Sequence, residues 1–194
     1  MRFLSLVLFC VLLKGASLYA QSGIQQIDNN ILEKLAAGRT PGQTSFWYGI
    51  SHVNNYVNIG VPAGLLVAGL IRNDEPMKEN ALYVASSTAS SYLLDYLIKI
   101  IVRRPRPFIV DLHLTPVYRP GEYSFPSGHT SSSFGTMVAL SRAYPKWYVI
   151  APALLWSTSI GYSRLYLGVH NPSDVLAGAA LGTGAAFGMG FLKH

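Results

Sequence analysis

Residues suited to phosphate chemistry lie close together in the stretch Ser163–Asp174, which reads SRLYLGVHNPSD. His170 and Asp174 are four residues apart, so a helical backbone would place them on one face, within contact. A carboxylate at one ring nitrogen of a histidine fixes the tautomer and makes the other nitrogen a better nucleophile or base. Arg164 adds a permanent planar cation whose donors suit phosphate oxygens. Taken alone, the stretch equally fits an ordinary loop histidine and an aspartate that caps a helix.

Two more polar clusters precede this stretch. Lys99 and Arg106 belong to the pattern K-x6-R-P at the end of an apolar segment, and residues 126–129 read PSGH at the start of another. Backbone N–H groups at a helix start bind phosphate, and the glycine at position 128 would let an oxyanion approach closely. The three clusters together supply cations, two histidines, a carboxylate and a helix N-terminus.

These residue types suit phosphoryl transfer without a metal ion. Charge in the transition state spreads over the equatorial oxygens, so positioned donors and cations supply most of the stabilisation. An in-line displacement also needs one group that attacks and one that protonates the leaving oxygen, and His129 and His170 could divide these roles. Asp174 and the two histidines alone would be a thin ligand set, and no other spacing indicates a metal site.

Each cluster alone also fits a structural role. Lys99 and Arg106 could hold their charged ends at the membrane surface, as long basic side chains do at helix ends. The PSGH stretch could be a turn and cap, and Arg164 could anchor a helix at the interface. The arrangement of the whole chain is what distinguishes the two interpretations.

The composition predicts a membrane protein with one domain. Of 194 residues, 50% are hydrophobic and only 12% are charged, whereas roughly 25% are charged in soluble domains. The basic residues give a formal net charge of +6 and mostly flank apolar segments, which suits membrane orientation and anionic headgroups better than nucleic acid. The one cysteine, Cys10, lies in the first apolar segment, so the rest of the chain has no disulfide and no thiolate metal site.

The N-terminal residues 1–20 have the pattern of a secretory signal peptide, with Arg2, an apolar core and small residues before Gln21. Cleavage after Ala20 and retention as an N-terminal anchor both remain open. Residues 21–194 are expected to form a single domain. Isoleucines and leucines at helical spacing over 24–45 predict an amphipathic helix that lies on the membrane surface.

Five apolar segments predict an all-α bundle with about five spans, or six if the N-terminal segment is retained. The segments cover residues 56–72, 81–102, 128–144, 147–167 and 172–192. If residue 21 lies outside, alternation of the spans leaves basic residues in the inside turns, in agreement with the positive-inside rule. These are Arg72, Lys78, Arg142, Lys146 and Lys193. The three polar clusters then share the outer face. The positive-inside rule disfavours arginine on that face, and binding of an anion would explain why arginines are found there.

The three clusters resemble the signature of the type 2 phosphatidic acid phosphatase (PAP2) superfamily, which is K-x6-R-P, then P-S-G-H, then S-R-x5-H-x3-D. Every signature position is matched, by Lys99, Arg106, Pro107, Pro126, Ser127, Gly128, His129, Ser163, Arg164, His170 and Asp174. The signature spans residues 99–174, and the flanking segments are similar to those of membrane-embedded bacterial members. The resemblance implies a PAP2-like helical core and a phosphatase.

The resemblance also implies roles for these residues. His170 would attack phosphorus and form a phosphohistidine, Asp174 would orient that ring, and His129 would protonate the leaving group and then help to activate water. The phosphate-binding groups would be Lys99, Arg106, Ser127, Gly128 and Arg164. No metal or other cofactor is expected. Further substrate contacts could come from Arg103, Arg104, His113 and Tyr118, which no pattern distinguishes.

The expected function is metal-independent hydrolysis of a lipid phosphomonoester or diphosphate. Phosphatidate, phosphatidylglycerophosphate, undecaprenyl diphosphate and lipid A phosphate are candidates, with headgroup contacts expected from loops over 40–56 and 108–125. The expected location is the bacterial inner membrane, multi-pass, with the active site facing the periplasm. Expected partners are the lipid substrate and membrane lipids, without nucleic acid, and the oligomeric state is open.

Three alternatives remain at this stage. A soluble periplasmic acid phosphatase of the same superfamily and a vanadium-dependent haloperoxidase would both use the same phosphate pocket, but the apolar segments argue against soluble proteins. A lipid-binding or transport membrane protein would explain intramembrane charges. It would have no evident use for the pair His129 and His170 together with Asp174.

Overall fold

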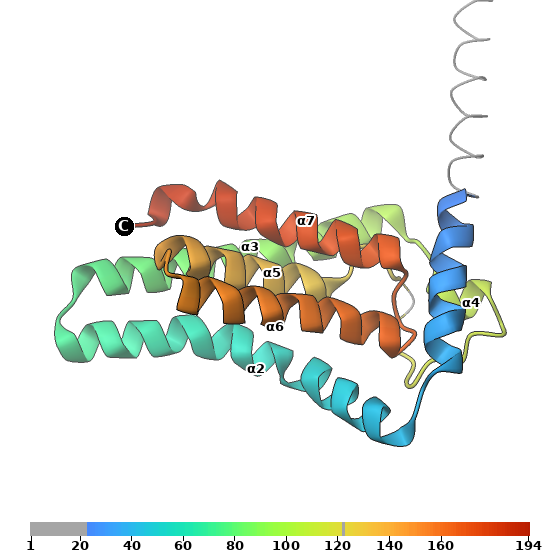
Figure 1. Ribbon diagram of the computed structural model, residues 1–194. Helices are drawn as coiled ribbons and strands as arrows, with labels where there is room; N and C mark the ends of the chain where they lie inside the picture. Colours follow the sequence, from blue (N-terminus) through green and yellow to red (C-terminus); the bar gives the residue numbers. More distant parts are fainter. Residues whose placement is uncertain (1–22, 122) are drawn as a thin grey trace, which may run out of the picture.

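The computed structural model describes residues 23–121 and 123–194. Its long helices lie side by side in one bundle, and a shorter helix, residues 23–37, crosses one end of that bundle (Figure 1). The segment 1–20, for which a signal peptide or an N-terminal anchor is expected, lies outside the described residues. A single domain from residue 21 onward stays a prediction.

Five long helices make up the bundle in the described part of the chain. They are α2 (Pro41–Arg72), α3 (Glu75–Val102), α5 (Gly128–Ala143), α6 (Trp147–Tyr166) and α7 (Pro172–Gly188). The short helix α4 (Pro107–Val110) lies between α3 and α5, and a 3-10 turn, η1 (Gly190–Leu192), follows α7. The described residues contain no strand beyond one isolated bridge between Pro105 and Tyr123, so the predicted all-α fold is confirmed.

The first helix of the bundle begins earlier than its apolar pattern predicts. α2 starts at Pro41, not at residue 56. The Thr40 hydroxyl caps it by accepting a hydrogen bond from the Gln43 amide at 3.4 Å, and proline suits the first helical position because its missing N–H needs no partner there. The expectation of a loop over 40–56 is therefore wrong, and these residues are helical from Pro41 onward.

The N-terminal helix is shorter than the surface helix predicted over 24–45. It ends at residue 37, because residues 38–40 interrupt it and the next residues already belong to α2. Leu32 and Asp28 are buried, whereas Ile24 and Ile27 are exposed. This helix therefore packs on the end of the bundle through a face that is partly apolar and partly charged. Its contact with a membrane surface stays a prediction.

Small polar side chains fill the interior of the bundle, and large apolar side chains cover its outside. On α3, Ser87 and Ser91 are buried, whereas Leu93 and Ile101 are exposed. This distribution suits helices whose outer faces meet lipid, because small residues allow close packing and lipid offers no partner to polar groups. Among the described helices, α2 is the one that is long and apolar enough by itself to cross a membrane.

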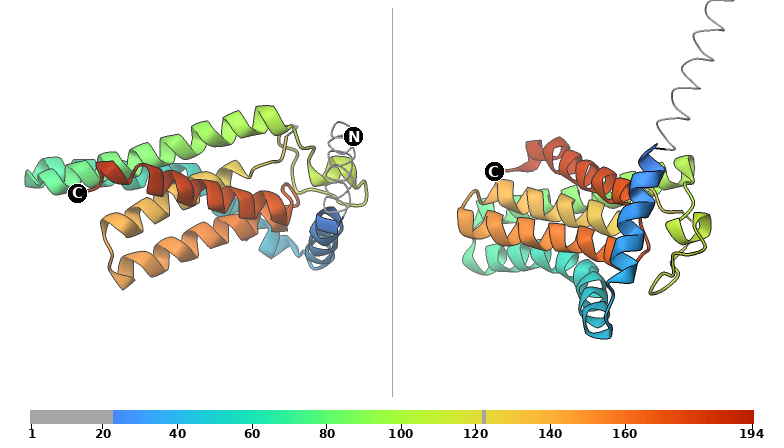
Figure 2. Two further views of the ribbon diagram at one scale, coloured as in Figure 1. Left: turned by 90° about the horizontal axis from the view of Figure 1, so that it is seen from above. Right: turned by 45° about the vertical axis from the view of Figure 1, so that its right-hand side comes forward.

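Helix α5 lies at the centre of the bundle and contacts α3, α6 and α7. Its close approach to α7 requires a glycine, since a Cβ at Gly178 would lie 2.7 Å from the carbonyl oxygen of Ser127. The helices alternate in direction, as Figures 1 and 2 show. The starts of α2, α5 and α7 therefore meet the ends of α3 and α6 at one end of the bundle, and the three motif clusters occupy this end.

Candidate active site

His170 lies in the short connection between α6 and α7 and is almost completely buried, with 2% of its surface exposed. Its Nε2 is 3.3 Å from Nη1 of Arg106, and its Nδ1 is 3.8 Å from Oδ2 of Asp174. The second distance is longer than a hydrogen bond but keeps the carboxylate beside the ring. The two ring nitrogens thus face a cation on one side and an anion on the other.

The carboxylate of Asp174 takes part in capping the N-terminus of α7. It stands in the first turn of α7 and forms a capping box with Asn171, whose amide donates to Oδ2 at 2.8 Å. His170 precedes this cap and lies outside the helix. Its contact with Asp174 therefore does not come from helical spacing, which is what the sequence had suggested. The cap turns the chain back over the start of α7, and this turn brings the imidazole to the carboxylate.

Two buried arginines lie near the histidine. Arg106 donates through Nη1 to the Val169 carbonyl at 2.6 Å. Arg164, in the last turn of α6, is 2% exposed, donates to the Ser51 hydroxyl and lies over the ring of Tyr118 with Cζ 5.6 Å from the centroid. Its Nε has no partner among the described residues. A buried cation with an unused donor is costly, so this arrangement favours binding of an anion.

The PSGH stretch forms the start of α5. Ser127 is the N-cap residue, and its amide donates to the carbonyl oxygen of Asp174 at 3.0 Å, which joins this stretch to α7. Its hydroxyl pairs with Thr130 at 2.9 Å, and no side chain caps the first amides of the helix. These amides point out of the N-terminus of the helix, which is the positive end of the helix dipole. They are therefore suited to bind phosphate oxygens.

The lysine of the first cluster is held by a carboxylate. Lys99 Nζ lies 3.0 Å from Oδ2 of Asp95, one turn earlier on α3. Gly128 packs against the same group, since a Cβ there would lie 2.9 Å from Asp95 Oδ2. Contact with Asp95 therefore explains the glycine at 128, for which the sequence suggested only room for an oxyanion. Phosphate binding by Lys99 and Gly128 stays a prediction.

One residue of the site, Arg104, was not distinguished by the sequence. Its Nη1 donates to Asp174 Oδ1 at 2.7 Å and to Ser173 Oγ at 2.6 Å, and its Nη2 donates to Asp28 Oδ2 at 2.9 Å. Asp28, in the N-terminal helix, also accepts from the Ser173 amide at 3.0 Å. A contact across 145 positions leaves no trace in one sequence. The available signal was that Arg104 stands two residues before Arg106.

The other residues considered as substrate contacts differ in position. Arg103 and His113 are exposed, and Arg103, which follows the end of α3, donates to the carbonyl of Ile100 in the last turn of that helix. Tyr118 lies beneath Arg164 and contacts Tyr48 with ring centroids 5.7 Å apart. Of these residues, Tyr118 and Arg104 are therefore the two that the fold brings to the motif residues.

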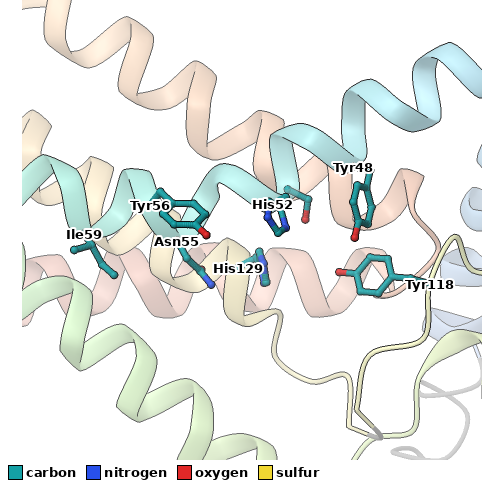
Figure 3. A pocket seen from close by; sticks show the side chains of 8 residues that line it. Tyr48, His52, Asn55, Tyr56, Ile59, Tyr118 and His129 are labelled. Carbon is teal, nitrogen blue, oxygen red and sulfur yellow. The ribbon is translucent and has the colours of Figure 1, made fainter.

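A cavity of about 390 Å³ opens beside His129 (Figure 3). One wall is the first part of α2, and the loop before α5 supplies the opposite side. The lining residues are Tyr48, Ser51, His52, Asn55, Tyr56, Ile59, Tyr118 and His129. Most of them come from 40–56 and 108–125, the two segments from which headgroup contacts were expected, although the first of these is a helix.

Burial shifts the pKa values of the site residues that lie in the loops between the helices. Loss of water is the main cause that lowers the pKa of His170 to about 3; Arg164 and Arg106 act in the same direction, and Asp174 opposes them. Burial also lowers the pKa of Arg106, to about 10. At neutral pH, His170 is therefore uncharged, and its Nε2 faces an arginine that keeps its charge.

The donor set suits an anion. Within residues 23–121 and 123–194, no three His, Cys, Asp or Glu side chains gather in the manner of a metal site. The groups that converge are cations, a neutral histidine and uncapped amides. A tetrahedral oxyanion such as phosphate matches them, because it accepts hydrogen bonds on several sides at once.

Comparisons with known proteins agree with this geometry. The PAP2 superfamily profile matches residues 80–190. A lipid A 4'-phosphatase of Bacteroides thetaiotaomicron is 32% identical over 111 residues, which are 57% of this chain and 49% of that protein, so the chain spans about half its length. A decaprenylphosphoryl-5-phosphoribose phosphatase of Mycobacterium tuberculosis is 34% identical over 145 residues, 73% of this chain and 76% of that protein.

A solved structure shares the fold over nearly the whole chain. It is the crystal structure of a transmembrane PAP2-type phosphatidylglycerolphosphate phosphatase from Bacillus subtilis, with a TM-score of 0.74 and 26% identity over 96% of this chain and 94% of that one. The profile match covers more than half of the chain and includes all three motif clusters. The chain therefore belongs to the PAP2 superfamily.

Proposed function

We propose that this protein is a membrane phosphatase that hydrolyses a lipid phosphate through a phosphohistidine intermediate on His170. The observation that carries the proposal is the setting of this residue: a buried, neutral imidazole with Nε2 3.3 Å from the Arg106 guanidinium and Nδ1 facing Asp174. Positive groups around a neutral nucleophile suit attack on an anionic phosphate.

The reaction has two displacements at phosphorus. Nε2 of His170 forms a bond to phosphorus while the bond to the leaving oxygen breaks, and His129 gives its proton to that oxygen. Water then attacks phosphorus, His129 takes the proton, and the nitrogen–phosphorus bond breaks to release inorganic phosphate. Arg106, Arg164 and the amides at the start of α5 hold the equatorial oxygens, where charge is spread in both transition states.

Asp174 supports both steps without touching phosphate. Its Oδ2 stands 3.8 Å from Nδ1 of His170, so its charge stabilises the imidazole when phosphorylation makes that ring positive. Arg104 holds Oδ1 at 2.7 Å and fixes the carboxylate in place. Lys99 is the third expected phosphate cation, and its pairing with Asp95 holds it near the end of α3.

The proposed location is the bacterial inner membrane, with the site facing the periplasm. The motif residues gather at one end of the bundle, and the basic residues expected inside lie in the turns and terminus at the other end. Exposed apolar side chains on the outer helix faces support lateral access of a lipid from the bilayer and disfavour a soluble acid phosphatase. Carbonate extraction should leave the protein in the membrane fraction, and its release would favour the soluble alternative.

Phosphate release by purified protein in detergent tests the activity. Wild type is expected to release phosphate from at least one of lipid A phosphate, phosphatidate, phosphatidylglycerophosphate and undecaprenyl diphosphate. His170→Ala is expected to abolish release, and His194→Ala, which changes an exposed histidine that pairs with Glu79 at the start of α3, is expected to keep it. Near-normal turnover by a folded His170→Ala protein would refute the mechanism.

A further inference from the structure

The cavity beside His129 has a lining that the phosphate chemistry does not use. Its lining includes Ser51 and Tyr118, which both contact Arg164. The cavity therefore adjoins the expected phosphate-binding residues, on the side of the expected acid, His129. The group that accepts a proton from His129 is the leaving oxygen, so this cavity lies where the lipid part of the substrate must begin.

The α2 wall of this cavity presents a row of flat rings. Tyr48, His52 and Tyr56 are spaced four residues apart and therefore share one helix face. The rings of Tyr48 and His52 are nearly parallel, with centroids 6.2 Å apart and planes at 14°, and the His52 and Tyr56 centroids are also 6.2 Å apart, with planes at 55°. Figure 3 shows the three side chains along α2 beside His129. Such a row offers aromatic surface to the C–H groups of a bound molecule.

Between the rings stand neutral hydrogen-bonding groups. Asn55 and Ser51 contribute an amide and a hydroxyl, and Tyr118 adds a phenol. Among the described residues that line the cavity there is no lysine, arginine, aspartate or glutamate. A second phosphate in this place would meet none of the strong cations that phosphate sites use. Hydroxyl groups on a ring would find both donors and acceptors.

A second, mostly apolar cavity lies beside the first. It measures about 590 Å³, lies between α2 and α3, and shares Ile59 with the first cavity. Its lining is apolar over most of its length and includes Pro62, Leu66 and Ala85. The Tyr92 hydroxyl donates to Asn55 Oδ1 at 2.9 Å, and this bond stands where the polar cavity meets the apolar one.

From this arrangement we infer that the substrate is a phosphomonoester carried on an uncharged sugar headgroup of a glycolipid. The sugar stacks on the α2 ring row and bonds to Asn55, its phosphate reaches His170, and its chains lie in the groove between α2 and α3. The assignment rests on the proposed phosphatase function and gives it a substrate class. A lipid diphosphate fits less well, because its inner phosphate would occupy a cavity whose described lining contains no lysine or arginine.

Steady-state kinetics in one detergent with three lipids tests the assignment. The lipids are a phosphorylated glucosamine lipid, phosphatidate and undecaprenyl diphosphate. The glucosamine lipid is expected to have a kcat/KM about tenfold or more above that of each other lipid, which corresponds to one stacking contact with its hydrogen bonds. Equal or faster turnover of the diphosphate or of phosphatidate would overturn the sugar assignment and leave the phosphatase function intact. No release from any of the three would overturn the sugar assignment, and a failure to release phosphate from phosphatidylglycerophosphate as well would overturn the phosphatase function.

Variants of the cavity distinguish a headgroup site from a ring of interface aromatics. Tyr56→Ala and Asn55→Ala are expected to lower the preference for the glucosamine lipid over phosphatidate about tenfold. Tyr148→Ala changes a tyrosine of similar exposure, 61% against 69% for Tyr56, at the start of α6, and should leave the preference unchanged. If Tyr56→Ala and Asn55→Ala slow all three lipids by the same factor, these residues only anchor the protein and the inference is wrong.

Discussion

Arg104 Nη1 donates to Asp174 Oδ1 at 2.7 Å, while the other oxygen of that carboxylate faces His170. The loop after α3 and the first turn of α7 are therefore tied at the residue that orients the nucleophile. Through Nη2 the same guanidinium reaches Asp28, so the N-terminal helix belongs to this arrangement as well. We expect Arg104 to act as a positioning residue that works through Asp174.

Replacing Arg104 should slow chemistry more than it weakens substrate binding. Arg104→Gln removes a charged hydrogen bond to Asp174, worth about 1.5–3 kcal/mol, so kcat should fall about 10- to 100-fold with little change in KM. Arg103→Gln is the matched control, since Arg103 is exposed and donates to the carbonyl of Ile100. Equal kcat values for the two variants would show that Arg104 does not position Asp174.

Removing Asp28 should destabilise the protein. The side chain of Asp28 is buried and pairs with Arg104 and the Ser173 amide. Asp28→Ala leaves the Ser173 amide without its acceptor and removes one of the two carboxylates that Arg104 contacts. Breaking a buried ion pair costs about 3–5 kcal/mol, and the cost is smaller here because Arg104 is partly exposed and keeps its bond to Asp174. Thermal unfolding in detergent should show a clearly lower Tm than for Glu33→Ala, a change at an exposed position of the same helix. An unchanged Tm would mean that the N-terminal helix contributes no stability through this contact.

The fold and the gathering of the motif residues at one end of the bundle could be predicted because their signals are local or repeated. Apolar segments mark the helices, and the fixed spacing of Lys99, Arg106, His129, His170 and Asp174 marks the phosphate site. The start of α2 was predicted too late because its first turns combine polar and aromatic residues, and the cap at Thr40 outweighs this low hydropathy. The contact between Asp28 and Arg104 could not be predicted, because it depends on how the N-terminal helix crosses the bundle. No spacing of residues in the sequence indicates that crossing.

Glycine at position 128 is predicted to be essential for activity for a packing reason. In Gly128→Ala the new Cβ would stand 2.9 Å from Asp95 Oδ2, so the carboxylate and its partner Lys99 must shift. We expect a loss of kcat of at least about tenfold, because small displacements at a reacting site are costly. Gly184→Ala on α7, where a Cβ meets nothing within 4 Å, should keep full activity. Full activity of Gly128→Ala would show that the contact with Asp95 is dispensable.

The buried histidine should make stability depend on pH in a defined window. The pKa of His170 is about 3 in the folded protein and about 6.5 in an unfolded chain. Between these values the unfolded state binds more protons, so stability rises with pH and is lost as pH falls from about 6.5 toward 3. His170→Gln removes this titration, so the difference in Tm between pH 7 and pH 4 should be smaller in the variant than in wild type. Differential scanning fluorimetry in detergent measures both values, and His194→Gln serves as the control for an exposed histidine. An equal pH response in wild type and His170→Gln would contradict a neutral, buried nucleophile.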